Sequence, residues 1–137
     1  MADVFTQLVS LGADPQSGVY CHAGCSDRAI QDMQAAATRA LGCHVPAAFV
    51  RLLRLSNGLQ INSAYFKTAE QLVPENLDCP RQHVIILGNA GNVEEYIYDT
   101  QDHQFHITTM GFPAERYATF ATLEAMIHAI LHQQQVL

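Results

Sequence analysis

The chain has 137 residues, of which 49% are hydrophobic and 15% charged. This length fits one domain with one hydrophobic core, and the low charge density excludes a disordered chain. The net charge is −6. Nucleic acid and anionic membranes are therefore unfavourable partners, whereas a basic protein is a favourable one.

The N-terminus has no basic region followed by an apolar core, and no apolar run approaches the roughly 20 residues that span a bilayer. We therefore expect a soluble, cytoplasmic protein. The cysteines are then reduced thiols rather than a disulfide framework, because a chain of this size stabilises itself without one. There are four of them: Cys21, Cys25, Cys43 and Cys79.

The negative charge is concentrated in residues 68–102. This segment holds seven acidic residues against one arginine, Arg81, which gives it a net charge of −6. Such a segment indicates either an acidic surface that attracts a basic protein or a face that keeps the protein soluble. The acidic residues are Glu70, Glu75, Asp78, Glu94, Glu95, Asp99 and Asp102.

The first half of the chain predicts helices. Residues 4–11 have helical spacing of apolar residues, residues 12–25 form a loop, and Ser26 or Asp27 begins a helix that Gly42 ends. A further helix begins with Pro46 at its first position and ends at Asn57-Gly58, a pair that tolerates left-handed backbone.

The second half predicts strands followed by a helix. The expected elements, in order, are strands at 59–61 and 64–66, a helical turn at 68–72 capped by Thr68, strands at 84–87, 93–98 and 105–109, a loop at 111–118 and a helix at 120–133. Gaps of hairpin length allow only antiparallel pairing. The sequence thus predicts an α+β fold with N-terminal helices, a central antiparallel sheet of about four to six strands, and a C-terminal helix packed on the sheet.

Two motifs suggest a metal or nucleotide site. Cys21-His22-x-x-Cys25 followed by Cys43-His44 offers zinc ligands, but adjacent side chains do not easily chelate one ion, and small buried thiols are the favoured interpretation. Gly88-Asn89-Ala90-Gly91 follows a strand, as a phosphate loop does. Two glutamates follow it in place of Lys-Ser, so we interpret it as a hairpin turn.

Acid–base groups occur near residue 100, where Asp99 and Asp102 lie close in sequence to His103 and His106. No evident nucleophile lies beside them, and Asp99 is expected to accept backbone hydrogen bonds in its turn. We therefore expect no enzymatic activity, no cofactor and no resident metal.

Three features occur in a defined order. The first is Val45-Pro46, Phe49, Leu52 and Asn57-Gly58, the second is Leu87-Gly88 followed by Tyr96-Ile97-Tyr98-Asp99, and the third is Phe120 with the helix after it. Together they resemble motifs of the SUKH superfamily, which includes yeast cell-wall-synthesis regulators and many bacterial immunity proteins. Val45 stands where Leu or Ile is commoner. The match covers residues 28–132.

The resemblance implies a single SUKH-like domain over residues 1–137, with residues 1–27 as an N-terminal extension. It implies fold positions for Pro46, Asn57, Gly58, Gly88 and Asp99, and no catalytic residues. It also implies an immunity protein that neutralises a cognate toxin, such as a nuclease, by occlusion. Since nuclease sites are basic, we expect the partner-binding residues to be Glu94, Glu95, Asp99 and Asp102. The alternatives are a scaffold with several host partners and, less favoured, a small metal-binding protein.

Overall fold

The computed structural model describes residues 3–78, 83–110 and 115–137. Arg81, Cys79 and residues 111–114 of the predicted loop lie outside this part of the chain. In chain order the elements are α1 (Val4–Gly12), β1 (Val19–Tyr20), α2 (Asp27–Leu41), α3 (Ala47–Leu55), β2 (Gln60–Ile61), β3 (Ala64–Phe66), α4 (Ala69–Asp78), β4 (Val84–Ala90), β5 (Glu94–Asp99), β6 (Gln104–Thr109), β7 (Arg116–Phe120) and α5 (Leu123–Gln133).

The α+β class is confirmed, with all strand pairs antiparallel. The strands form one sheet in the order β1-β2-β3-β4-β5-β6-β7, so each strand pairs with its neighbour in sequence. The described residues hold seven strands, one more than the expected upper limit. β1 and β7 are the additions. β1 lies within the predicted loop 12–25, whereas β7 takes the end of the predicted loop 111–118 and also Phe120, which was wrongly predicted to belong to the last helix. That helix begins at Leu123, because Thr122 is its N-cap and accepts the Ala125 N–H. β1 has only two residues, and β7 shows no clean alternation of buried and exposed positions.

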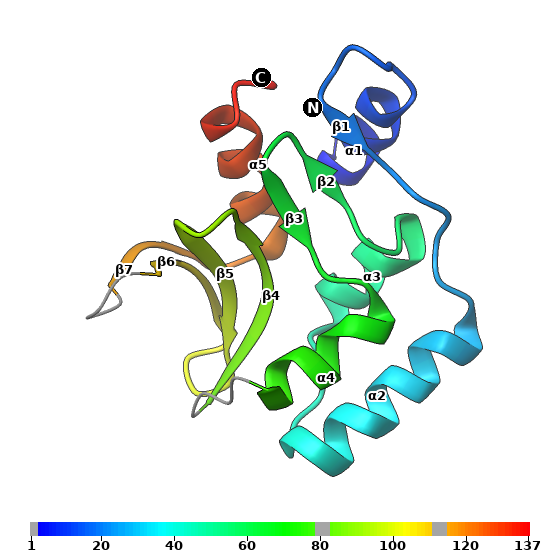
Figure 1. Ribbon diagram of the computed structural model, residues 1–137, viewed down its shortest axis with the longest axis vertical. Helices are drawn as coiled ribbons and strands as arrows, with labels where there is room; N and C mark the ends of the chain where they lie inside the picture. The colour runs from blue at the N-terminus through cyan, green and yellow to red at the C-terminus, as the bar shows by residue number, and fades with distance from the viewer. Residues whose placement is uncertain (1–2, 79–82, 111–114) are drawn as a thin grey trace.

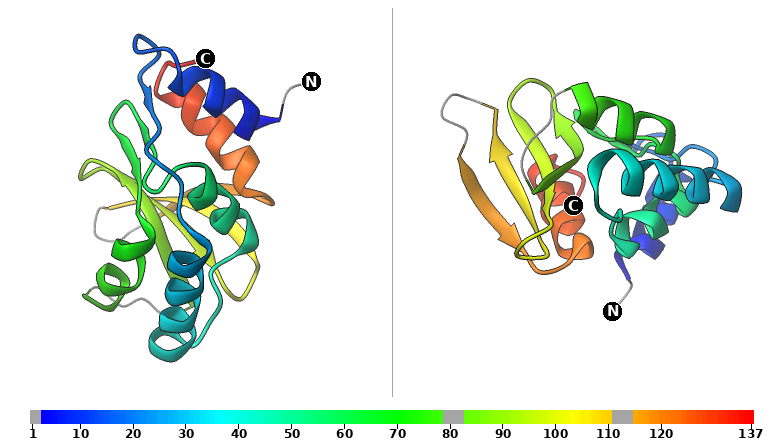
Figure 2. Two further views of the ribbon diagram at one scale, coloured as in Figure 1. Left: turned by 90° about the vertical axis from the view of Figure 1, so that its right-hand side faces the viewer. Right: turned by 90° about the horizontal axis from the view of Figure 1, so that it is seen from below.

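Helix α5 packs on one face of the sheet, next to α1 (Figure 1, Figure 2). Their apolar residues meet those of β3 to β6 in a single core, in which Leu8, Phe49, Tyr96 and Ile127 are fully buried. Helices α2 and α4 contact each other beside the sheet, as the second view of Figure 2 makes clear. No described helix is both long and apolar enough to cross a membrane.

The ends of helices α2 and α3 lie close to the predicted positions. Ser26 caps α2 by accepting the Ala29 N–H at 3.2 Å, and Gly42 ends it with a φ of 71°. Pro46 is the N-cap of α3 rather than its first residue, because its backbone is still extended at a ψ of 143°. Ser56 ends α3 in an extended conformation, and the left-handed position falls on Gly58, whose φ is 90°.

Helix α4 runs six residues beyond the predicted turn, in spite of Pro74 within it. Thr68 starts it as expected, since its hydroxyl accepts the Gln71 N–H at 3.1 Å. Buried Asn76 explains the extension. Its amide donates to Ile86 O at 3.0 Å and accepts the Ile86 N–H at 2.8 Å, which ties the last turn to β4. This tertiary contact compensates for the hydrogen bond that proline cannot make.

Candidate functional site

The four acidic residues expected to bind a partner do not form one open surface. Glu94, Glu95 and Asp99 are buried, with exposed fractions of 7%, 6% and 7%, and Asp102 alone is exposed. Successive residues of a strand point to opposite faces, so Glu94 and Glu95 cannot share one. Glu94 faces α5, where it accepts the Gln133 side-chain amide at 3.0 Å. This geometry corrects the expectation of an acidic face made by β5.

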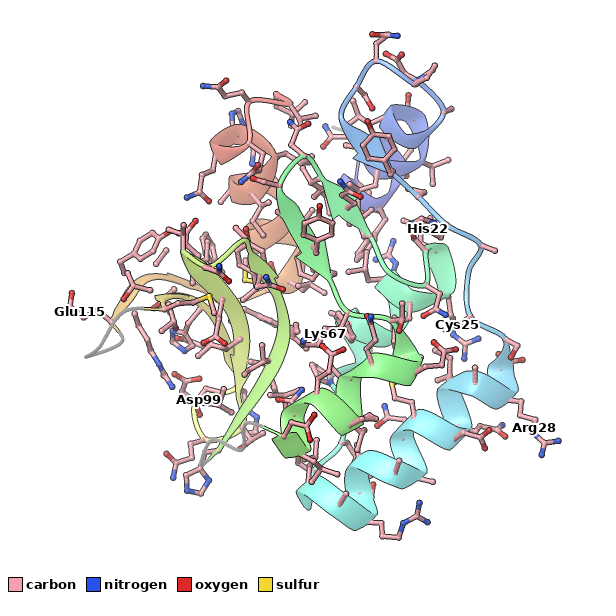
Figure 3. The ribbon with its side chains drawn as sticks, viewed as in Figure 1. His22, Cys25, Arg28, Lys67, Asp99 and Glu115 are labelled. Atoms are coloured by element: carbon pink, nitrogen blue, oxygen red, sulfur yellow. The ribbon has the colours of Figure 1, made fainter. Side chains whose placement is uncertain are left out.

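Asp99 and Asp102 do come together, with His106 and Arg116, in a group that we call the Asp99 cluster (Figure 3). The Arg116 guanidinium donates to Asp99 Oδ2 at 2.8 Å and lies 4.0 Å from Asp102 Oδ2. The other Asp99 oxygen accepts the Gln101 N–H at 2.7 Å, which confirms the predicted turn cap. Burial pushes the pKa of Asp99 upward, but these hydrogen bonds outweigh it and hold that pKa below its usual value.

His106 links Asp102 to the edge strand. Its Nε2 lies 2.9 Å from Asp102 Oδ2, and its Nδ1 lies 2.9 Å from the Thr119 hydroxyl. A carboxylate–imidazole–hydroxyl chain is the arrangement that activates a nucleophile in hydrolases. Here Thr119 lies outside the lining of the groove described below. These hydrogen bonds instead give both ring nitrogens of the buried His106 a partner, and they connect β7 to β6.

Asp99, Asp102 and His106 are also the group of described residues whose side chains lie close enough to hold a metal ion. The guanidinium of Arg116 already supplies the positive charge of this cluster. Cys21, Cys25, Cys43 and His44 are not among that group, so the residues of the disfavoured zinc motif are not gathered around one point. Burial is the main influence on the three thiols, and it raises the pKa of each.

A groove lies on the sheet face opposite α5. Tyr20 pairs with Gln60, Gln60 with Tyr65, Tyr65 with Asn89, and Asn89 with Glu95. Directly paired residues project from the same face, so this row of side chains crosses five neighbouring strands. Glu95 points away from α5, which fixes the row on the far face. Tyr20 and Tyr65 remain 49% and 47% exposed.

Two adjoining hollows form this sheet-face groove. One, of about 350 Å³, is lined by His22, Gln60, Tyr65 and Gln71 among others, and the second, of about 270 Å³, by Asp78, Glu95 and Met110 among others. They share Lys67, Glu75 and Asn89. Lys67 forms an ion pair with Glu75 of α4 and stands between the sheet and that helix in Figure 3. The groove is therefore mainly polar, with Tyr65 in the first hollow and Met110 in the second.

Asn57 fixes one wall of the groove, and this role accounts for its place in the Asn57-Gly58 motif. Its side-chain oxygen accepts the Ala69 N–H at 2.8 Å, at the start of α4. Its amide donates to the two Glu70 carboxylate oxygens at 3.0 and 3.3 Å. That donation is the main reason why the pKa of Glu70 lies below its usual value. Gly58 is required beside it, because a Cβ there would lie 2.8 Å from Thr68 Cγ2.

Sequence reasoning missed the groove. Its lining residues come from β2 to β5, the loops beside these strands and α4, and only the strand register brings Tyr20, at the end of the row, next to Gln60. The available signal was Tyr65 alternating with buried Ala64 and Phe66, which places a tyrosine on the outer face of a strand. No known family model matches this chain, and no curated protein gives a significant match.

Proposed function

We propose that this protein is a non-catalytic protein-binding module of the SUKH superfamily, and that it binds its partner through the sheet-face groove. In this proposal it is an immunity protein. Its partner is a basic toxin domain, and neutralisation is by occlusion of the toxin's active surface.

The observation that carries the proposal is the row of Tyr20, Gln60, Tyr65 and Asn89 on one sheet face, in which both tyrosines are exposed and the two amides are half-buried. Tyrosine is enriched at the centres of protein interfaces, since it buries a large area at the cost of few rotatable bonds. Both tyrosines are about half exposed, and Tyr65 stands on β3, which is paired with a strand on each side. Met110, which is 39% exposed, adds an apolar side chain to the second hollow.

The charge around the groove favours a basic partner. On the side of α4 that faces this groove stand Glu75 and Asp78, and the helix has no basic residue. Glu75 is balanced by Lys67, whereas the exposed Asp78 belongs to no ion pair among the described residues. Complementary charge at the rim of an interface speeds association and excludes wrong partners.

The proposal is tested by affinity capture from lysate of the native organism, at low and high salt, followed by co-expression of the captured protein. We expect one stoichiometric basic partner that is lost at high salt, because exposed charge pairs are screened. Expressed alone, that partner should arrest growth, and co-expression of this chain should restore it. Several substoichiometric partners, none of them toxic, would contradict the immunity function and favour a scaffold.

A further inference from the structure

A second groove, between α2 and α4, is apolar where the sheet-face groove is polar. It has a volume of about 410 Å³ and is lined mostly by carbon, with Met33 and Val73 buried at its base. Its remaining lining residues are Ala29, Asp32, Ala36, Ala69, Glu70, Pro74 and Leu77. Residues 70, 73, 74 and 77 share one side of α4, and Gln71, Glu75 and Asp78 turn toward the sheet-face groove. The two grooves therefore use different faces of one helix.

Leu77 is the most conspicuous residue of this second groove, since 47% of it is exposed on a helix that has apolar partners available. It also lines a smaller adjoining hollow of about 270 Å³ with Ala40, Leu41 and Val84. The depression thus continues along α2 from Ala29 to Ala40, and its far part has polar lining residues such as Asn76 and Thr100 beside the apolar ones. At 1.5 Å per residue that distance is roughly 17 Å, the length of about three helical turns. Small residues on α2 allow another helix backbone to approach closely.

Two exposed acidic residues stand at one end of the α2–α4 groove. Asp32 stands on the α2 wall with 75% of its side chain exposed, and the exposed Glu70 stands on the α4 wall. Arg28, the nearest ion-pair partner of Asp32, is 89% exposed and 4.0 Å away, so this pair is weak. Figure 1 shows α2 and α4 running in the same direction, with both N-termini at this acidic end.

We propose that the α2–α4 groove binds an amphipathic helix of a partner protein, about three turns long, whose apolar side covers Leu77 and whose C-terminal turn is basic. In this orientation the helix runs antiparallel to α2 and α4. Its basic residues then face Asp32 and Glu70, and its negative dipole end meets the positive ends of both helices. Apolar residues spaced by three and four positions are the usual content of such helix-in-groove contacts. This inference does not depend on the immunity function.

The test uses two synthetic 14-residue peptides, each labelled with fluorescein and each carrying leucines at helical spacing. One has arginines in its last turn and the other has glutamates there. We expect the full-length protein to bind the arginine peptide about tenfold more tightly, measured by fluorescence anisotropy. On addition of this peptide, the amide signals that shift in ¹⁵N-labelled protein should belong to α2 and α4.

Three variants locate the binding. Leu77→Gln should lower the affinity for both peptides about fivefold, because apolar contact is lost. Asp32→Lys should lower the affinity for the arginine peptide about tenfold and raise the affinity for the glutamate peptide, because it reverses the charge of one wall of the groove. Glu115→Lys is the matched control, because it makes the same charge change on an exposed residue far from α2 (Figure 3). It should leave both affinities within about twofold.

Equal affinity for the two peptides would overturn the proposal, as would an unchanged affinity in both Leu77→Gln and Asp32→Lys. Amide shifts confined to the sheet-face groove would also overturn it. Asp32 is largely exposed, so Asp32→Lys remains a valid test even if Leu77→Gln unfolds. If the affinity capture yields no toxin but the arginine peptide still binds as expected, the result counts against the proposed immunity function and not against this inference.

Discussion

The Asp99 cluster and the sheet-face groove lie on the same face of one sheet and use similar residue types in opposite ways. In the Asp99 cluster each charge meets a partner within the chain, and Asp99 and His106 are buried. In the sheet-face groove the tyrosines are half exposed, and Glu75 keeps 44% of its side chain exposed. The difference teaches that the acidic residues of the central segment divide into buried ones on β5 and exposed ones on α4, of which Asp78 has no ion-pair partner among the described residues.

The two regions should therefore respond differently to substitution. Changes in the Asp99 cluster should lower the free energy of unfolding, whereas changes in the sheet-face groove should lower affinity with little effect on stability.

Gly88 should give the largest effect, because β3 and β4 meet there without space for a side chain. A Cβ on Gly88 would lie 2.1 Å from the backbone oxygen of Tyr65, which cannot move without disturbing the strand pair. We expect Gly88→Ala to lower the free energy of unfolding by about 3 kcal/mol, measured by urea denaturation. The control is Gly91→Ala, where no atom lies within 4 Å and only the φ of 54° opposes alanine. It should cost about 1 kcal/mol, and equal losses would contradict this account.

Asp99→Ala should give the next largest effect, a loss of about 2 kcal/mol. It removes the acceptor of the Gln101 N–H and of the Arg116 guanidinium in one step. The matched substitution in the groove is Glu75→Ala, whose partly exposed pair with Lys67 should contribute less than about 1 kcal/mol. A larger loss for Glu75→Ala than for Asp99→Ala would reverse the contrast between the two regions.

The pH dependence of stability should also depend on Asp99. Its folded pKa lies below the ordinary value of 3.8. The folded state therefore favours the charged form, and this stabilisation is present above that ordinary value and is lost as the pH falls through the folded pKa. Urea midpoints of the wild type should fall between about pH 5 and pH 2.5 more steeply than those of Asp99→Asn. Parallel curves would show that Asp99 contributes nothing to acid unfolding.

Tyr65→Ser should give the smallest change in stability, below about 0.5 kcal/mol, because the tyrosine is half exposed and its hydroxyl has only a 3.4 Å contact with Gln60. The same change should weaken partner binding by about tenfold or more if Tyr65 is an anchor of the interface. Thermal unfolding checks the first expectation, and titration calorimetry with the captured partner checks the second. Tyr117→Ser is the control, since Tyr117 is 51% exposed but belongs to the edge strand β7.

Much of the fold followed from local sequence signals. Ser26 and Gly42 bound α2 as predicted, and the alternation through Phe105 and Ile107 gave β6. The length of α4 was underestimated because its last turn depends on the hydrogen bonds of Asn76 to β4, between residues ten positions apart. β7 was missed because neither face of an edge strand is fully buried there, so the pattern of period two is absent.

The candidate site was less predictable, because charge along a sequence does not say which face a residue occupies. Glu94 and Glu95 are consecutive acids, yet one bonds to Gln133 of α5 and the other lines the groove on the opposite side of the sheet. Likewise, Arg116 neutralises Asp99 from 17 positions away. Only the pairing of β5, β6 and β7 decides these contacts.

The most direct test of the central claim compares two baits in one capture experiment, Tyr65→Ser and Asp102→Asn, with the wild-type protein as reference. Asp102 is the exposed acidic member of the Asp99 cluster, so its substitution tests the acidic surface that was first expected. The account predicts that Asp102→Asn retains the stoichiometric partner and Tyr65→Ser loses it. Retention by Tyr65→Ser together with loss by Asp102→Asn would place the interface on the acidic cluster and contradict the account.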